Sequence, residues 1–241
     1  MGKSCLRMVV PFLVVVLSVG WPVRAQNGIL TEVQILLVTK EEGTLEKAQA
    51  MLEKLLAKEP QNVSALCLLA EAHFHYGGFL KPGEGIKHWE QAQAYAERAT
   101  ELDPSCAHAH YLVAASLGRI GDAQGILKSL FLVNPMLYHL ETTLVLDPNH
   151  AWAHFALSHM YDRLPARPLG RGDAAQALAF ARTAWELEPT EPEFSLQYAR
   201  LLIKQEQLDQ AKEVLTTALT SPSIRWTIPL RDEAEQMLHR L

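Results

Sequence analysis

The chain has 241 residues, of which 49% are hydrophobic and 20% charged, and its formal net charge is −5. This mildly acidic balance, with no cluster of Lys and Arg, argues against nucleic acid or an anionic lipid surface as the partner. Cys67 and Cys106 lie too far apart in so long a chain to form a disulfide framework, although a single bridge between them stays open.

The first 25 residues have the pattern of a secretory signal peptide. Lys3 and Arg7 precede an apolar run over residues 8–19, and small residues before Gln26 place the cleavage site after Ala25. An uncleaved membrane anchor is the weaker alternative, because the run is shorter than the roughly 20 residues that cross a bilayer. We therefore predict a secreted, periplasmic protein with one mature domain over residues 26–241. Its 19 basic and 27 acidic residues give a net charge of −8.

A repeated unit follows. Five acidic or polar residues each precede a proline, and the prolines lie 44, 44, 41 and 33 residues apart, which is typical of an array of supersecondary units. These dipeptides are Glu59-Pro60, Asp103-Pro104, Asp147-Pro148, Glu188-Pro189 and Ser221-Pro222.

Each unit has the pattern of two helices. Before each proline, small or apolar residues recur at steps of four and three, as in Ala92, Ala96 and Ala99, and this spacing predicts a helix with one buried face. After each proline a second helical pattern begins, for example at His110 and Val113. The second helical pattern of each unit contains a small residue, which would let the two helices pack closely. Each unit is therefore predicted to be a helical hairpin.

Quoted as "RATELDPSCAHAH" and "RTAWELEPTEPEF", the unit boundaries resemble the tetratricopeptide repeat, and the resemblance covers about residues 45–222. It implies an all-α fold: an α-solenoid of about four to five hairpins with a binding surface and no catalysis. We also find no phosphate-binding loop, nucleophile elbow or distinctive carboxylate pair, and the glycine-rich "GGFLKPGEG" is interpreted as a loop. No enzymatic activity and no cofactor are expected.

Three of the units are 10, 10 and 7 residues longer than the usual 34, and the extra residues fall between the two helices of a hairpin. The stretches "GRIGDAQGILKSL", "LETTLVLDPNHAWAHFALSHMYDRLP" and "GDAAQALAFARTAWEL" are similar to the T-component family of tripartite ATP-independent periplasmic (TRAP) transporters. That resemblance implies a scaffold that partners a periplasmic solute-binding protein, although the chain lacks that family's lipoprotein cysteine. Intracellular microtubule-associated relatives share the long units, but the predicted signal peptide disfavours them.

The histidines are interpreted as architectural. His110 and His154 occupy a slot where such repeats carry a large flat side chain, and an imidazole can fill it while hydrogen-bonding a backbone carbonyl. Only His150 and His154 have the four-residue step that brings two ligands together, and no carboxylate or cysteine completes a site. No metal site is predicted.

The first helix of each hairpin is expected to line a concave groove. The helical register assigns three rows of side chains to this groove. The apolar stripe is Cys67, Tyr111, Phe155 and Leu196, and the second stripe is Glu71, Ala115, His159 and Arg200. The more basic rim is His75, Arg119, Arg163 and Lys204. The leading hypothesis is a protein partner, with a TRAP-type solute-binding protein as the specific candidate. The alternatives are a small hydrophobic or anionic amphiphile bound in the groove, and assembly scaffolding without a ligand. The stripe could also pack against the N-terminal segment or another copy of the chain in a homo-oligomer.

Two further segments complete the predicted array. Residues 126–133 are the most apolar mature stretch, with Ile126, Leu127, Leu130, Phe131, Leu132 and Val133. We predict a short buried helix that covers the hairpin edge there, with an exposed docking patch as the alternative. At the end of the chain, Thr227 as N-cap and Pro229 in the first turn predict a capping helix with one apolar side.

Overall fold

The computed structural model describes residues 20–39, 41–166, 168–221 and 226–241, so most of the predicted signal peptide lies outside the described residues. The described residues form eleven α-helices, and none of these is both long and apolar enough to cross a membrane. The helices are α1 (Gly20–Thr39), α2 (Glu42–Leu56), α3 (Val63–Phe79), α4 (Pro82–Leu102), α5 (Ala107–Gln124), α6 (Ile126–Leu146), α7 (Ala151–Arg163), α8 (Ala174–Leu187), α9 (Pro192–Lys204), α10 (Leu208–Thr220) and α11 (Ile228–His239).

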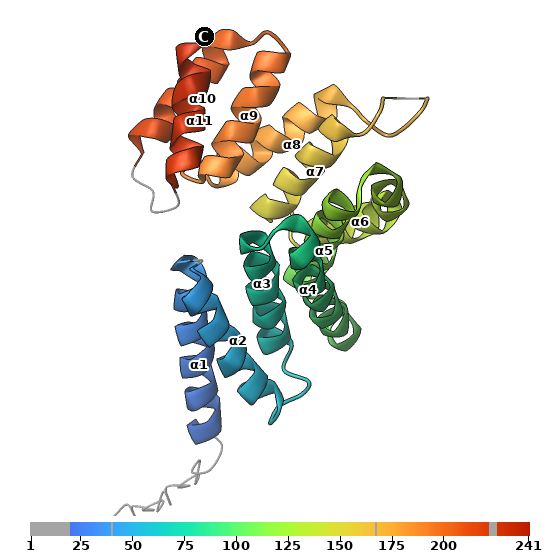
Figure 1. Ribbon diagram of the computed structural model, residues 1–241, viewed down its shortest axis with the longest axis vertical. Helices are drawn as coiled ribbons and strands as arrows, with labels where there is room; N and C mark the ends of the chain where they lie inside the picture. The colour runs from blue at the N-terminus through green and yellow to red at the C-terminus, as the bar shows by residue number, and fades with distance from the viewer. Residues whose placement is uncertain (1–19, 40, 167, 222–225) are drawn as a thin grey trace, which may run out of the picture.

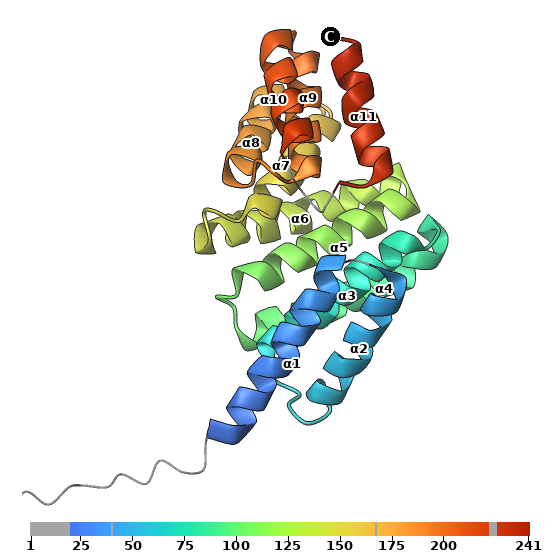
Figure 2. The ribbon, with the colours of Figure 1, turned by 90° about the vertical axis from the view of Figure 1, so that its left-hand side faces the viewer.

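Consecutive helices pair into five antiparallel hairpins that stack in chain order, and α11 packs on α9 and α10 at the end (Figure 1). The first helices of successive hairpins contact one another from α1 through α3, α5, α7 and α9 to α11. The second helices of successive hairpins make no such contact within the described part of the chain. The array therefore curves, with the first helices as an inner row and α6 on the outer side (Figures 1 and 2). The predicted all-α solenoid is confirmed.

The turns between hairpins are built from the repeated acidic residue and proline. The Asp103 carboxylate accepts a bond from the Ser105 backbone N–H at 3.0 Å, and Asp147 does the same with Asn149 at 3.1 Å. The proline between each pair cannot continue the preceding helix, because it lacks the backbone N–H. The near-identical turns place α5 and α7 on their preceding hairpins in the same way.

Between the helices of a hairpin, alanines allow close packing. Ala92, Ala96 and Ala99 on α4 are fully buried, as the ladder predicted, and so are the corresponding alanines of α8. At the C-terminal end Ala234 of α11 is buried against α9 and α10. The predicted capping helix is confirmed, with Thr227 at the N-cap position, although the Thr227 side chain makes no capping hydrogen bond.

The extra residues of the first two long units lie mainly in helices rather than in turns. α3 to α6 have 17, 21, 18 and 21 residues, whereas α9 and α10 have 13 each. The third long unit instead has a long connection between its helices, of which residues 164–166 and 168–173 are described.

The glycine-rich "GGFLKPGEG" is correspondingly not the predicted loop, because only Leu80 and Lys81 separate α3 from α4. A Cβ at Gly77 would lie 2.6 Å from Nε1 of Trp89, and one at Gly85 would overlap the carbonyl oxygen of Gly77. The glycines therefore allow two helices and an indole ring to pack closely.

The prediction for residues 126–133 was wrong in its main form. These residues are not a separate buried helix but the first two turns of α6, where Leu130 is 51% and Phe131 82% exposed. The side chains of Ile126 and Leu127 lie outside the description. Ser129 and Leu132 pack towards Gly121 on α5, and Val133 packs against the core, so Leu130 and Phe131 lie on the opposite, exposed side of the helix. The alternative of an exposed patch fits the structure.

Candidate interaction surface

The predicted apolar stripe lies on the inner row, but its four members differ in exposure. Cys67 and Leu196 are buried, whereas Tyr111 and Phe155 are half-buried. The Tyr111 ring lies 4.8 Å from the ring of His150, and Phe155 packs 5.1 Å from Phe194 on α9. The stripe is thus a partly filled aromatic row rather than an open apolar channel.

A carboxylate and two imidazoles flank this row at its N-terminal end. Glu71 of α3 lies 3.7 Å from Nε2 of His75 and 3.6 Å from Nε2 of His108 on α5. Burial acts to raise the pKa of Glu71, but the contacts with His108 and His75 outweigh it and hold that pKa well below its usual range. Nδ1 of His108 is also 3.4 Å from Nε2 of His150, so the cluster reaches across α3, α5 and the start of α7. Glu71 therefore stays ionised on the inner surface.

The remaining members of the second stripe lie farther along the row. His159 of α7 has its pKa lowered to about 4, first by burial and then by the positive charges of Arg200 and Arg163. Arg200 is exposed and donates to Glu233 of the capping helix at 3.0 Å. Ala115 of α5 is half-buried.

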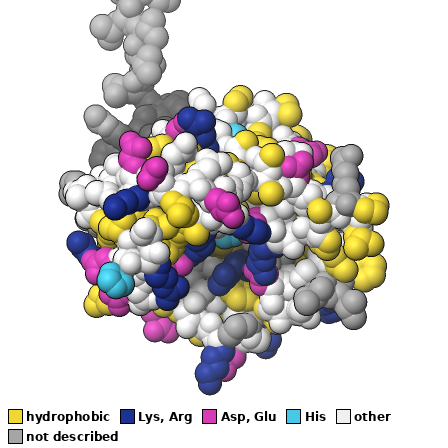
Figure 3. All heavy atoms as spheres, turned by 90° about the horizontal axis from the view of Figure 1, so that it is seen from above, with side chains coloured by type: hydrophobic (Ala, Val, Ile, Leu, Met, Phe, Trp, Pro, Cys, Tyr) yellow, Lys and Arg dark blue, Asp and Glu magenta, His cyan; other side chains and the backbone are white. Residues whose placement is uncertain are grey.

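The rim is less basic than the sequence pattern suggested, because each rim cation has a partner. Arg163 pairs with Asp122 at 2.9 Å and Lys204 with Asp162 at 2.6 Å. The Arg119 guanidinium instead lies 4.9 Å from the centre of the Trp89 ring. Seen from the C-terminal end, Lys and Arg side chains lie interspersed with Asp and Glu (Figure 3).

Two histidines perform the structural task predicted for them. His110 lies 3.1 Å from the carbonyl oxygen of Pro104 and His154 2.8 Å from that of Pro148, through Nε2 in both cases. Ser195 Oγ makes the equivalent contact with Pro189 in the next hairpin, at 3.4 Å. These imidazoles therefore fix the turns between hairpins. Among the described residues, no group of three or more His, Cys, Asp and Glu side chains could hold a metal ion.

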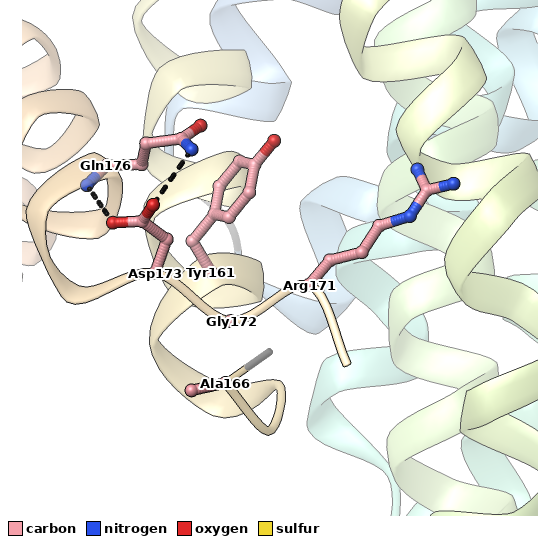
Figure 4. Close-up of a pocket in the computed structure, with 6 residues that line it drawn as sticks. All are labelled: Tyr161, Ala166, Arg171, Gly172, Asp173 and Gln176. Carbon is pink, nitrogen blue, oxygen red and sulfur yellow. Dashed lines mark hydrogen bonds between the residues drawn. The ribbon is translucent and has the colours of Figure 1, made fainter. Parts of the chain in front are cut away.

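A shallow pocket of about 530 Å³, which the sequence analysis missed, lies beside the connection between α7 and α8 (Figure 4). Asp173 accepts bonds from the backbone N–H of Ala175 and Gln176, and Tyr161 lies on the same side of the pocket. A Cβ at Gly172 would overlap the carbonyl oxygen of Leu164, so this glycine lets the connection fold tightly. The signal in the sequence was the closely spaced pair of glycines in "LGRGD".

The outer surface of α6 carries an apolar stripe that the sequence analysis found only in part. Phe131, Tyr138 and Val145 are 82%, 61% and 80% exposed, and their seven-residue spacing places them on one side of the helix. We call these three residues the α6 stripe. The same seven-residue spacing is present in the sequence, beyond the predicted patch at Leu130 and Phe131.

A family model described as "Regulator of microtubule dynamics protein 1-3" matches residues 29–160, which are 132 of the 241 residues. The chain belongs to the regulator of microtubule dynamics 1-3 family. The sequence analysis disfavoured microtubule-associated relatives because of the predicted signal peptide. The family match shows that this was wrong with respect to the family of the chain. Membership of the T-component family stays a prediction. No curated protein matches the chain.

The rest of this family member is matched as a tetratricopeptide array. A tetratricopeptide repeat model matches residues 169–221. A thermophilic tetratricopeptide protein of Thermus thermophilus superposes with a TM-score of 0.67 at 20% identity, covering 89% of this chain and 98% of that one. The pilF protein of Pseudomonas aeruginosa gives 0.57 at 16% identity, with 90% of each chain covered. These likenesses show the fold: a tetratricopeptide solenoid, an architecture that generally serves as a non-catalytic scaffold for protein interaction.

Proposed function

We propose that this protein is a scaffold that binds a protein partner along its inner row, at Glu71, Tyr111, Phe155 and His159. The observation that carries the proposal is the half-buried aromatic row beside an ionised carboxylate. Half-buried rings offer apolar contact area with little conformational entropy left to lose, and the Glu71 carboxylate supplies a fixed charge. A segment with apolar side chains and a basic residue fits this combination.

A crosslinked pull-down of tagged protein from its native source tests the inner row. Wild type is compared with Tyr111→Ala/Phe155→Ala, and Leu130→Ala/Phe131→Ala on the outer helix is the matched control. We expect one specific partner that the inner-row variant loses and the outer variant keeps. Circular dichroism of both variants checks that the fold persists. Loss of the partner only in the outer variant would instead assign binding to the α6 surface.

Family membership supports a partner in the microtubule system. Regulation of microtubule dynamics is the role named for the family whose model matches α2 to α6 and most of α1 and α7. Co-sedimentation with polymerised tubulin tests this form of the proposal, with the inner-row variant and Glu71→Gln beside wild type. We expect wild type in the pellet and a reduced bound fraction for both variants. Equal amounts of wild type in the supernatant with and without polymer would count against it.

An exported scaffold for a TRAP-type solute-binding protein is the second candidate, and the predicted signal peptide and the long hairpins favour it. It requires cleavage after Ala25 and a periplasmic location. Mass measurement of the mature N-terminus decides the first point, since cleavage would leave Gln26 as the first residue. An uncleaved chain in the cell fraction together with tubulin binding would overturn this candidate.

Binding of a small hydrophobic or anionic amphiphile in the groove is the alternative with least support. The rings of the inner row pack against one another, and the rim cations already contact acids or an indole ring. Native mass spectrometry of freshly purified protein tests it directly. A retained lipophile that Phe155→Ala loses would establish the alternative.

A further inference from the structure

The two cysteines described in the structure are neighbours in space, although 39 residues separate them in the chain. Cys67 lies on α3 and Cys106 is the N-cap residue of α5, and their Sγ atoms are 3.8 Å apart. Both are free thiols, with Cys67 buried and Cys106 half-exposed. This contact lies beside Glu71 and His108, and the proposed scaffold function makes no use of it.

The two thiols differ in burial and in their place on the helices, and these differences favour Cys106 as the thiolate. The hydrogen bond with Cys67 lowers the pKa of Cys106 to about 6, with further help from the Ala109 backbone N–H and His108, and burial opposes the shift. The same hydrogen bond and burial raise the pKa of Cys67. A thiolate at a helix N-terminus is a ready nucleophile when solvent reaches it, whereas a buried protonated thiol is inert until a partner is presented to it.

We propose that Cys67 and Cys106 are a redox modification site that forms a reversible disulfide with a small-molecule disulfide as the oxidant. The Cys106 thiolate attacks one sulfur of the oxidant, and a mixed disulfide forms as one small thiolate leaves. Cys67 gives its proton to that thiolate, and its sulfur then attacks Sγ of Cys106. The second small thiolate leaves and takes up the proton that Cys106 had lost. Two protein thiols are oxidised and one small disulfide is reduced to two thiols.

The cross-link would join two first helices of the inner row across the intervening α4. It would fix α3 against the start of α5 beside the Glu71–His108 contact and the Tyr111 ring. Closing a 39-residue loop also restricts the unfolded chain. Oxidation is therefore expected to raise the melting temperature and to slow amide exchange in α4.

The full chain is used for the test, with Cys5→Ser so that only the two neighbouring thiols report. The protein is equilibrated in glutathione buffers from fully reduced to fully oxidised, the remaining thiols are alkylated, and the products are weighed. Lys87 and Arg98 lie between the cysteines, so trypsin releases them on separate peptides that only a disulfide joins. We expect both thiols to disappear in one two-electron transition. The melting temperature should rise by about 5 °C or more.

Two single variants separate the roles. Cys67→Ala should leave Cys106 trapped as the mixed disulfide with glutathione, because nothing resolves it. Cys106→Ala should leave Cys67 reduced under the same buffer, and circular dichroism checks the fold of each variant. The proposal is overturned if both thiols stay alkylatable at full oxidation, if the disulfide joins two chains, or if Cys106→Ala traps glutathione as readily as Cys67→Ala. None of these readouts depends on a partner being found.

Discussion

Two pairs of hairpins, α3 to α6 and α7 to α10, stack in the same way. They differ in the side chains that fill the interfaces between their helices. In the first pair, imidazoles meet inside each hairpin: Nδ1 of His73 is 3.2 Å from Nδ1 of His88, and Nδ1 of His110 is 3.0 Å from that of His139. In the second pair, His154 faces the Phe180 ring instead, and Phe194 of α9 is fully buried against the rings of Trp152 and Phe155 on α7.

This difference shows that the repeat fixes where helices pack but leaves open what fills the space. The alanine ladders are buried in both halves, so the spacing of the helices is common to them. Pairs of facing imidazoles lie inside both hairpins of the first half, whereas the rings around Phe194 add apolar contact to the second. We expect the surroundings of Phe194 to respond most to lost volume, and α3 to α7, which carry the buried imidazoles, to respond most to acid.

The largest effect is predicted for Phe194→Ala. The Phe194 side chain is fully buried and contacts the rings of Trp152 and Phe155, so its removal leaves a cavity. We expect the free energy of unfolding to fall by about 3–5 kcal/mol in urea denaturation. Phe131→Ala is the control, since an 82% exposed ring on α6 should change it by about 0.5 kcal/mol or less. Similar losses in the two variants would contradict the assignment of Phe194 as a core residue.

The next largest effect tests the close packing of helices at buried alanines, which both halves share. Ala114 is buried where α5 meets α6 and α7, and Ala114→Leu should cost about 1–3 kcal/mol through overpacking. Ala179→Leu on the exposed side of α8 adds the same atoms where space is open, and should cost almost nothing. The comparison is made by thermal and urea denaturation. An equal cost at both positions would mean that leucine disturbs the helix itself rather than the interface.

How far the sequence predicted these features depends on whether they follow the repeat. The hairpins, the capping helix and the contact of His110 and His154 with a backbone carbonyl all follow from periodic residues, and the structure confirms them. The geometry of the inserted residues did not follow. Glycine signals a turn in isolation, but Gly77 and Gly85 permit the close approach of α3 and α4 around Trp89. That contact joins residues from two helices, so no local pattern reveals it.

For the inner surface, the sequence predicted which residues lie on the first helices but not which contacts they make with neighbouring helices. The register placed Tyr111, Phe155 and His159 on the first helices, and the structure has them there. The pairing of the rim cations depends on carboxylates from neighbouring helices, as between Arg163 and Asp122, and a single helical register cannot show it. The sequence left a single bridge between Cys67 and Cys106 open but could not show the contact, since the two residues are 39 positions apart. The role of the inner row in binding stays a prediction.

Acid should weaken α3 to α7 before α9 and α10, because the buried imidazoles lie in that part of the chain. Burial, with a smaller contribution from the facing His88, lowers the pKa of His73 to about 4, and burial also lowers the pKa of His88 and His139. Burial lowers the pKa of His150 and of His159 to about 4, so both act in the same direction as His73. The unfolded chain therefore takes up protons first as the pH falls below about 6.5. The contribution of these neutral imidazoles to the free energy of unfolding is fully present above that pH. It is lost as the pH falls towards 4, which lowers the free energy of unfolding by on the order of 1–3 kcal/mol.

Urea denaturation and hydrogen exchange at pH 7.5 and pH 5 measure this effect. Exchange should quicken in α3 and α4 before α9 and α10. His73→Leu removes the most buried imidazole of the pair while His88 remains, so the loss of stability between the two pH values should shrink. An unchanged pH dependence in that variant would show that other groups carry the response.

The smallest effect concerns the junction of the two halves. The Arg163–Asp122 pair links α7 to α5 at 2.9 Å, but its side chains are 64% and 45% exposed. Exposed pairs contribute little because water screens them and ordering the side chains costs entropy, so Asp122→Asn should cost about 0.5 kcal/mol. A double-mutant cycle with Arg163→Gln isolates the interaction. A coupling above about 1.5 kcal/mol would mean that charge holds the halves in register, whereas a small one would assign that task to buried Leu157 and Met160 where α7 meets α5 and α6.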